Sequence, residues 1–255
     1  MIMARRLTLE GADVVGMFEI LPFISGLRRN LVQCVRDFGI PLRLCTTVTE
    51  VKGRARVEAV LTSRVDAHFR PVPGTQEEVT CDTLLLSVGL IPENELSRLA
   101  GVRIDPITGG PRVDERYATS IPGVFAAGNV VHVYDLADEV TASALRAGRC
   151  AAEYALGKRP APTAPIGIIA GENVRHVVPQ VLHPSALTGG AVSLQFRVRQ
   201  PIEETVHAEV RAGEEVLVSK RLRYVRPAEM VILELEPAFA EPIERAGSLR
   251  VDIVR

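Results

Sequence analysis

The residues best suited to hold a ligand stand together in residues 119–129, Thr-Ser-Ile-Pro-Gly-Val-Phe-Ala-Ala-Gly-Asn. The turn at Pro122 and Gly123 and the apolar residues after it predict a short strand, 124–127, that ends at Gly128 and Asn129. Gly128 lets the backbone approach a bound group closely, and Asn129 offers both a hydrogen-bond donor and an acceptor. This chemistry suits the holding of a polar ligand at the edge of a sheet.

A helix predicted over residues 139–156 would direct its unpaired N–H groups and the positive end of its dipole toward that ligand. Asp138 is the expected N-cap of this helix. Small residues along the helix would allow close packing against a cofactor or a sheet: Ala142, Ala144, Ala147, Gly148, Ala151 and Ala152. A well-packed helix that contacts no ligand would have the same pattern.

Residues 82–94, Asp-Thr-Leu-Leu-Leu-Ser-Val-Gly-Leu-Ile-Pro-Glu-Asn, form a second informative stretch. They predict a buried strand over 81–89 that ends at Gly89, where the backbone can approach a cofactor. Pro92 then fixes the direction in which the chain leaves. Apolar strands that end in glycine are common, so residues 82–94 alone are not specific to a cofactor site. Their position before residues 119–129 in the chain makes them informative.

In this order, the two stretches resemble the domain-exit and second flavin-binding motifs of the FAD-dependent pyridine nucleotide-disulfide oxidoreductase superfamily. In the second flavin-binding motif of this superfamily, an Asp usually stands at the position of Asn129. Residues 85–97 and the Gly-Asn-Val form of the flavin motif are similar to NAD(FAD)-dependent dehydrogenases associated with glycerol-3-phosphate dehydrogenase-like proteins. The resemblance implies that FAD is held by Gly128, Asn129 and the first turn of the helix, at Val140 and Thr141, against the pyrimidine edge of the flavin.

An acidic residue near the N-terminus extends the resemblance to a nicotinamide site. Residues 12–18 predict a strand that ends in Glu19, which has the type and place of the carboxylate that binds the adenosine ribose of NAD in a βαβ unit. A solvated carboxylate at a strand end is an equally good interpretation. No G-x-G-x-x-G occurs in the 255 residues. FAD and NAD are thus implied by resemblance, and the glycine loops would come from an upstream half or an oxidoreductase partner subunit.

Several other residues invite a chemical role that their surroundings do not support. His132 and Tyr134 could transfer protons, but a loop histidine with an ordinary hydrogen bond is the simpler interpretation, so we assign no catalytic residue. Cys34 and Cys45 are too far apart for a CxxC dithiol, which argues against a flavin-to-disulfide relay. The histidines of the C-terminal part have no metal-ligand spacing, and we predict no metal site.

The predicted elements indicate an α/β chain that changes character after residue 157. Residues 157–165 are punctuated by proline, and six alternating segments follow at 174–181, 191–198, 205–211, 215–225, 230–235 and 249–254. We predict an incomplete Rossmann-like two-dinucleotide-domain flavoprotein fragment, followed by an all-β antiparallel sandwich. The expected domains are a partial NAD(P)-binding domain (1–93), the C-terminal part of an FAD-binding domain (94–157), a linker (158–166) and the sandwich (167–255).

Composition and charge argue against two classes of function, those of nucleic-acid-binding and membrane-spanning proteins. A formal charge of −1, 4% aromatic residues and no Trp argue against a nucleic-acid partner. No apolar run reaches the roughly 20 residues of a membrane span, and no signal-peptide pattern opens the chain, so we expect a cytoplasmic protein, in an oligomer or complex.

The predicted function is an FAD-dependent NAD(P)H oxidoreductase, or its C-terminal portion, that moves hydride or electrons between nicotinamide, flavin and a partner or small substrate. The alternative is a non-catalytic assembly or interaction subunit that retains a partial oxidoreductase fold. An unproductive, truncated gene product is a third possibility.

Overall fold

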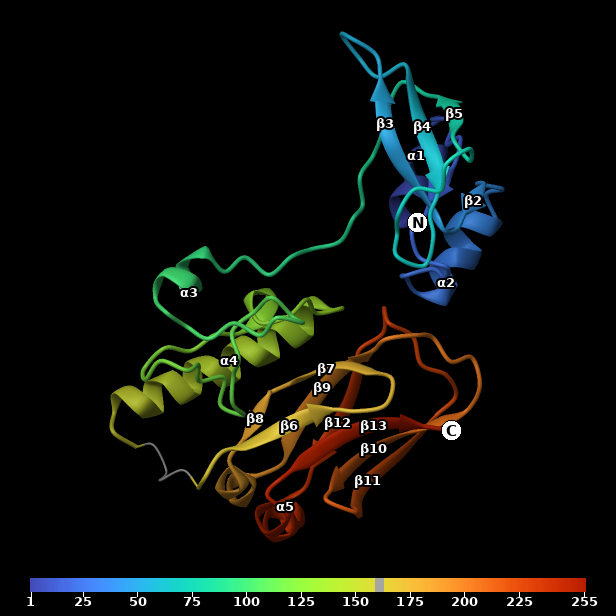
Figure 1. The fold of residues 1–255 in the computed structure, drawn as a ribbon. Coiled ribbons are helices and arrows are strands. Elements are labelled where there is room, and N and C mark those ends of the chain that lie inside the picture. The colour runs from blue at the N-terminus through green and yellow to red at the C-terminus, as the bar shows by residue number, and fades with distance from the viewer. Residues whose placement is uncertain (159–162) are drawn as a thin grey trace. The chain divides into compact units, whose positions relative to one another are not determined.

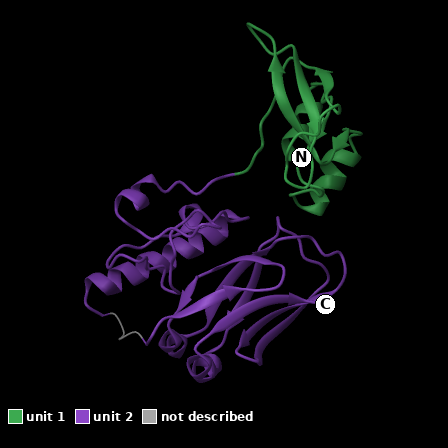
Figure 2. Ribbon diagram, viewed as in Figure 1, with its two compact units in different colours: residues 1–89 green, residues 90–255 purple. Residues whose placement is uncertain are grey.

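The computed structural model describes residues 1–158 and 163–255, which form two compact units, Met1–Gly89 and Leu90–Arg255 (Figure 2). Four residues of the predicted linker, 159–162, lie outside the described residues. Among the described helices, none is long and apolar enough to cross a membrane.

Unit 1 combines short helices with a three-stranded antiparallel sheet of order β3-β4-β5 (Figure 1). Strands β3 (Thr46–Lys52) and β4 (Ala59–Arg64) form a hairpin, and β5 (Glu77–Thr80) completes the sheet. The remaining elements are α1 (Ile2–Leu9), β1 (Met17–Phe18), α2 (Arg28–Leu31), a π-helical turn η1 (Val32–Arg36) and β2 (Leu42–Arg43), which pairs parallel to β1.

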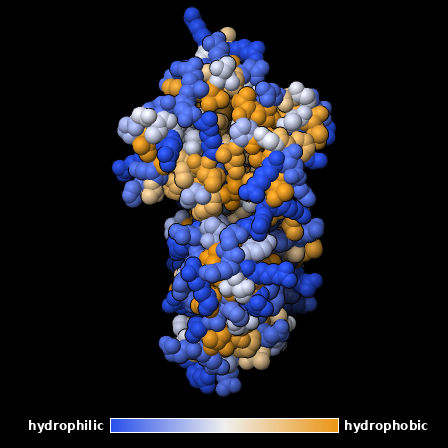
Figure 3. All heavy atoms as spheres, turned by 90° about the vertical axis from the view of Figure 1, so that its right-hand side faces the viewer, coloured by the Kyte–Doolittle hydropathy of each residue, from blue (hydrophilic) through white to orange (hydrophobic). Residues whose placement is uncertain are grey.

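The surface of unit 1 exposes many apolar side chains. Helix α1 buries no residue, and its Ile2 and Met3 are 58% and 63% exposed. Apolar side chains gather among polar ones in the upper part of the view in Figure 3. Because the hydrophobic effect favours removing such surface from water, unit 1 offers more apolar area than its own elements cover.

The predicted buried strand over residues 81–89 is wrong. Beyond Thr80 the chain is irregular, and Leu86 and Val88 are 74% and 89% exposed. An apolar run of this kind is stable as a buried strand only where neighbouring strands pair with its edges and other elements cover both of its faces. Within unit 1, β5 already pairs with β4, and no other described strand is placed to flank residues 81–89.

The first part of unit 2 is mostly irregular chain around one long helix. Helix α3 (Glu95–Leu99) is short, and η2 (Gly128–Val130) is a single 3-10 turn. Helix α4 (Ala137–Ala155) spans 19 residues and buries Ser143, Ala147 and Cys150. The strand predicted over 124–127 is reduced to one bridge, between Ala118 and Phe125, because no neighbouring strand of the described chain continues the ladder.

The second part of unit 2 is rich in β-strands, and we call residues 166–255 the β-rich domain. Its five-stranded sheet has the order β11-β10-β13-β6-β8, and its three-stranded sheet has the order β12-β9-β7 (Figure 1). The strands are β6 (Ile166–Ala170), β7 (Val174–Val178), β8 (Val181–Leu182), β9 (Val192–Val198), β10 (Val206–Ala212), β11 (Glu215–Leu222), β12 (Val231–Leu235) and β13 (Leu249–Val254). Short helical segments η3 (Pro184–Gly189), η4 (Pro237–Phe239) and α5 (Ala240–Ala246) join them.

The inner faces of both sheets contribute to one core, as the alternation of apolar residues predicts. In β9 and β10 every second residue is buried, so Leu194, Phe196 and Val198 from one sheet share a cluster with Ala208 and Val210 from the other. All six predicted strand segments contain a strand. The prediction missed β6, which pairs parallel to β13, so the five-stranded sheet is mixed rather than purely antiparallel.

Truncating Phe196 tests this core. Its side chain is fully buried in β9, so Phe196→Ala should lower the free energy of unfolding by about 3–5 kcal/mol, through lost burial and the cavity left behind. Val216→Ala, at a position 40% exposed in β11, should change it by less than about 1 kcal/mol. Urea denaturation followed by circular dichroism measures both, and equal losses would contradict the proposed core.

Candidate functional site

The Gly-Asn pair forms a tight turn against helix α4. Gly128 has φ +70°, a conformation that side-chain-bearing residues rarely adopt, and a Cβ at this position would lie 3.1 Å from Val140 Cγ1. The Gly128 N–H donates to Ser143 Oγ at 3.1 Å. The turn is therefore fixed directly on the first turns of α4, although the predicted strand before it is absent.

Asn129 is exposed, and its side-chain oxygen takes part in a hydrogen bond. Its Oδ1 accepts a hydrogen bond from the Tyr134 N–H at 3.1 Å, which closes the loop between the two residues. The side-chain amide is thus held in place by its oxygen while the residue faces solvent. Such a group is positioned to donate to a ligand.

Helix α4 begins slightly earlier than predicted. Its N-cap is Leu136, not Asp138, and Asp138 and Glu139 lie in the first turn. Thr141 is exposed, and its hydroxyl donates to the Ala137 carbonyl at 3.0 Å. The two acidic side chains stabilise the helix end through its dipole, but they also offset the attraction of that end for an anion.

Asn94 connects the two sequence motifs, a role that the sequence reasoning missed. Its amide nitrogen donates to the Val130 carbonyl at 2.8 Å and to the Gly109 carbonyl at 3.1 Å, and its side chain is 4% exposed. The end of residues 82–94 is thereby joined to the Gly-Asn turn. The available signal was a polar side chain just after Pro92, where an apolar run gives way to a short helix.

The chain around the Gly-Asn turn is held by the β-rich domain. The backbone of Val113 bonds to Gln180 twice, through the Gln180 side-chain oxygen at 2.9 Å and the Gln180 N–H at 3.1 Å. Arg197 of β9 donates to the Val133 carbonyl at 3.0 Å and forms an ion pair with Asp135. These bonds tie the chain on both sides of the Gly-Asn turn to the β-rich domain.

His132 and Tyr134 are buried, so the structure offers neither as an exposed acid or base. His132 is 2% exposed, and its Nε2 lies 3.1 Å from Gln195 Oε1. Burial, with the nearby His176 adding to it, lowers the pKa of His132 to about 3. Burial likewise raises the pKa of the Tyr134 hydroxyl. Near neutral pH both side chains are uncharged.

The remaining two predicted residues, Glu19 and Gly89, belong to unit 1. The Glu19 carboxylate accepts the Leu21 N–H at 3.0 Å and the Ser25 hydroxyl at 2.8 Å, which orders the loop after β1. Gly89 has φ +89° and no described atom near the place of a Cβ, so it lies in open chain. The structure groups Gly128, Asn129, Val140 and Thr141 within unit 2.

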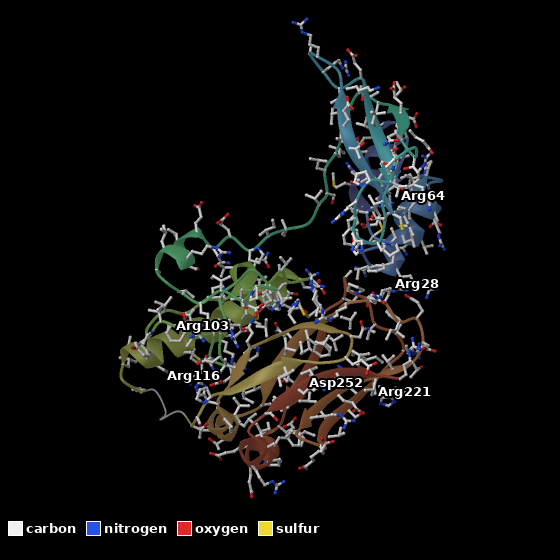
Figure 4. The ribbon with its side chains drawn as sticks, in the orientation of Figure 1. Arg28, Arg64, Arg103, Arg116, Arg221 and Asp252 are labelled. Carbon is white, nitrogen blue, oxygen red and sulfur yellow. The ribbon has the colours of Figure 1, made fainter. Side chains whose placement is uncertain are left out.

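A cavity of about 360 Å³ lies elsewhere in unit 2, and none of the four grouped residues lines it. Its wall combines three arginines with a buried carboxylate, a thiol and an imidazole: Arg103, Arg112, Arg116, Asp114, Cys150 and His183. Figure 4 labels Arg103 and Arg116 close to one another on this side of the unit. The cavity is therefore separate from the Gly-Asn turn.

Comparison with known proteins identifies the family of this chain. Residues 6–147 match the model of the pyridine nucleotide-disulphide oxidoreductase family, more than half of the chain. The chain belongs to this family. Its members are FAD- and NAD(P)-dependent oxidoreductases. The match includes both sequence motifs and ends inside α4, before the β-rich domain begins.

The curated relatives match over the same part. An NADH oxidase of Streptococcus pyogenes is 32% identical over 134 residues, which cover 50% of this chain and 26% of that protein. The mitochondrial dihydrolipoyl dehydrogenase of Caenorhabditis elegans is 36% identical over 128 residues, 48% of this chain and 24% of the relative. The matched part therefore spans about a quarter of the length of these relatives. A solved thioredoxin reductase from Streptococcus pyogenes is 22% identical, with a TM-score of 0.34, over 60% of this chain and 48% of that one.

A pair of glycine substitutions tests the Gly-Asn turn. Gly128→Ala should lower the free energy of unfolding by about 1–2 kcal/mol, because the new Cβ meets both a left-handed backbone and Val140. Gly148→Ala, in the interior of α4 with nothing within 4 Å of its Cβ, should raise it by about 0.5–1 kcal/mol. Thermal and urea unfolding measure both; effects of the same sign would contradict the described geometry.

The buried histidines predict a loss of stability in acid. Burial lowers the pKa of His132 to about 3 and that of His176 to about 4, from an ordinary value of 6.5. Below pH 6.5 the unfolded chain takes up protons that the folded chain does not, so the free energy of unfolding falls as the pH drops from 6.5 toward 4. Each group contributes a slope of up to about 1.4 kcal/mol per pH unit.

Urea titrations at several pH values measure this slope. His176→Gln should make it shallower, whereas His207→Gln, at a partly exposed position of β10 bonded to Ser219, should leave it unchanged. If His176→Gln leaves the slope as it is in the wild type, the pH dependence of stability does not come from the buried His176.

Proposed function

We propose that this chain provides the part of an FAD-dependent NAD(P)H oxidoreductase that contacts the flavin, and that the enzyme moves hydride or electrons between nicotinamide, flavin and a partner or small substrate. The observation that carries the proposal is the family match over residues 6–147, with Asn94 joining the two motifs inside it. FAD, when bound, supplies the centre that accepts hydride and passes on electrons.

The Gly-Asn turn has the features that such a cofactor needs. Gly128 has no side chain to block a ligand, so its backbone would allow close approach of the cofactor beside Val140. Asn129 would donate through its amide, which its bond to Tyr134 orients. Val140 and Thr141 would contact the same group from the first turn of α4, as the resemblance implies.

The nicotinamide side of the proposal rests on Glu19. Its carboxylate is already ordered by Leu21 and Ser25, so it would meet an adenosine ribose with little loss of side-chain entropy on binding. Gly89 would allow close approach of the exit segment to a cofactor. The glycine loops that cradle the phosphates would come from a polypeptide other than residues 1–255, because no G-x-G-x-x-G occurs in them.

Flavin binding tests the proposal directly. FAD titrated into the purified chain, alone and mixed with the product of the neighbouring upstream gene, should show quenched flavin fluorescence, and the bound flavin should bleach when NADH is added. Asn129→Ala should weaken FAD binding about tenfold, the loss of one well-placed hydrogen bond. Asn30→Ala, at a site in α2, is the matched control.

A folded chain that neither binds FAD nor supports NADH-dependent dye reduction in either mixture would overturn the enzyme proposal. That outcome would favour the assembly or interaction subunit, for which the β-rich domain would be the docking element. A chain that fails to fold when expressed alone would favour the truncated gene product.

A further inference from the structure

Two consecutive carboxylates and a histidine converge inside unit 2, away from the Gly-Asn turn. Asp114 and Glu115 are 7% and 4% exposed, and both face His183, which follows β8 in the β-rich domain. His183 Nδ1 lies 3.2 Å from Glu115 Oε2 and 3.9 Å from Asp114 Oδ2. One ligand atom from each residue lies within 4.8 Å of the other two.

Hydrogen bonds from the surrounding backbone hold these groups in place. Asp114 Oδ1 accepts the N–H groups of Arg116 and Ala118, both at 2.9 Å, which leaves Oδ2 turned toward His183. Glu115 Oε2 accepts the His183 N–H at 3.0 Å. The ligand atoms are thus fixed before anything binds, which lowers the entropy cost of binding.

The charges in this cluster favour a cation. Two neighbouring buried carboxylates repel each other, and a cation between them would relieve that repulsion. The guanidinium of Arg116, which follows Glu115 in the chain, forms an ion pair with Glu153. A single imidazole carries at most one positive charge, whereas a divalent cation would balance both carboxylates.

Access comes from the cavity. Asp114 and His183 both line it, so a cation held by the three residues would keep an open side toward that space. Arg112 lines the same cavity, and its Nε is buried without a hydrogen-bond partner in the described part of the chain. A guanidinium with an unused donor beside an open coordination position suits an anion or a water as the remaining ligand.

We propose that Asp114, Glu115 and His183 form a binding site for a divalent transition-metal cation of the Zn²⁺ or Mn²⁺ class. One imidazole nitrogen with two carboxylates matches the mixed donor set of such ions, and three protein ligands with an open side are too few for a dedicated Ca²⁺ cage. The site joins the family-matched part of the chain, which ends at residue 147, to the β-rich domain. It does not depend on flavin binding.

Sequence spacing could not reveal this site. His183 stands far from the two carboxylates along the chain, and its distance from the other histidines suits no ligand pattern. Folding brings His183 to the carboxylates because Gln180, three residues earlier, pairs with the backbone of Val113.

Mn²⁺ titration tests the proposal on the full chain after treatment with a chelator. The signal of free Mn²⁺ in electron paramagnetic resonance should show one bound ion per chain, and added Zn²⁺ should displace it. Mn²⁺ is the first probe because it prefers oxygen and nitrogen ligands to the four free thiols of the chain.

Two variants locate the ion. Asp114→Asn keeps the Oδ1 acceptor of the turn but removes the charge, and should weaken Mn²⁺ binding at least about tenfold; His183→Gln should do the same. His207→Gln is the matched control and should bind like wild type. Circular dichroism confirms that each variant is folded.

Absence of stoichiometric binding to the folded wild-type chain would overturn the proposal and leave the cluster as a buried ion pair. Binding that Asp114→Asn does not weaken would overturn it as well, because the ion would then lie elsewhere. Should His183→Gln not fold, the isosteric Asp114→Asn decides the matter.

Discussion

The organisation of unit 2 depends on the hydrogen bonds between residues 113–135 and the β-rich domain. The irregular chain around the Gly-Asn turn has backbone bonds within local turns, such as those from the Ala126 N–H to Tyr117 and from the Val131 N–H to Gly128, and these do not join it to a sheet. From the β-rich domain, Gln180 bonds to the Val113 backbone, Arg197 to the Val133 carbonyl and Gln195 to the His132 side chain. A small apolar cluster of Val113, Val131 and Val178 packs at the same place. The family-matched segment of unit 2 and the β-rich domain are therefore one structure.

Much of the β-rich domain could be predicted because alternation is a local property. Leu194, Phe196 and Val198 must share a face of β9 whatever lies opposite, and all three are buried. The parallel pairing of β6 with β13 could not be predicted, since it joins residues at opposite ends of the domain and has no local signature. The strand expected at 81–89 failed for a related reason: an apolar run becomes a strand only beside others, and its composition does not say whether they are present.

The sequence predicts that Gly128 lets the backbone approach a bound group closely, and in the structure this glycine packs against Val140 of α4. The assignment of its ligand came from family resemblance, and the family is confirmed by the match over residues 6–147. Asn94 and the carboxylates at 114 and 115 went unnoticed because their partners lie far along the chain. The residue type of His132 suggests proton transfer, but its buried surroundings lower its pKa and keep the side chain neutral.

The hydrogen bonds to β9 limit the motion of the loop that contains the Gly-Asn turn, residues 128–135. In many proteins a ligand-binding loop opens independently, at a small fraction of the free energy of global unfolding. Here the loop shares its hydrogen bonds with β9, whose side chains form the centre of the apolar core. Gln195 of β9 bonds to the His132 side chain and Arg197 bonds to the Val133 carbonyl, so the loop is tied to a strand of the core and cannot serve as a freely moving lid.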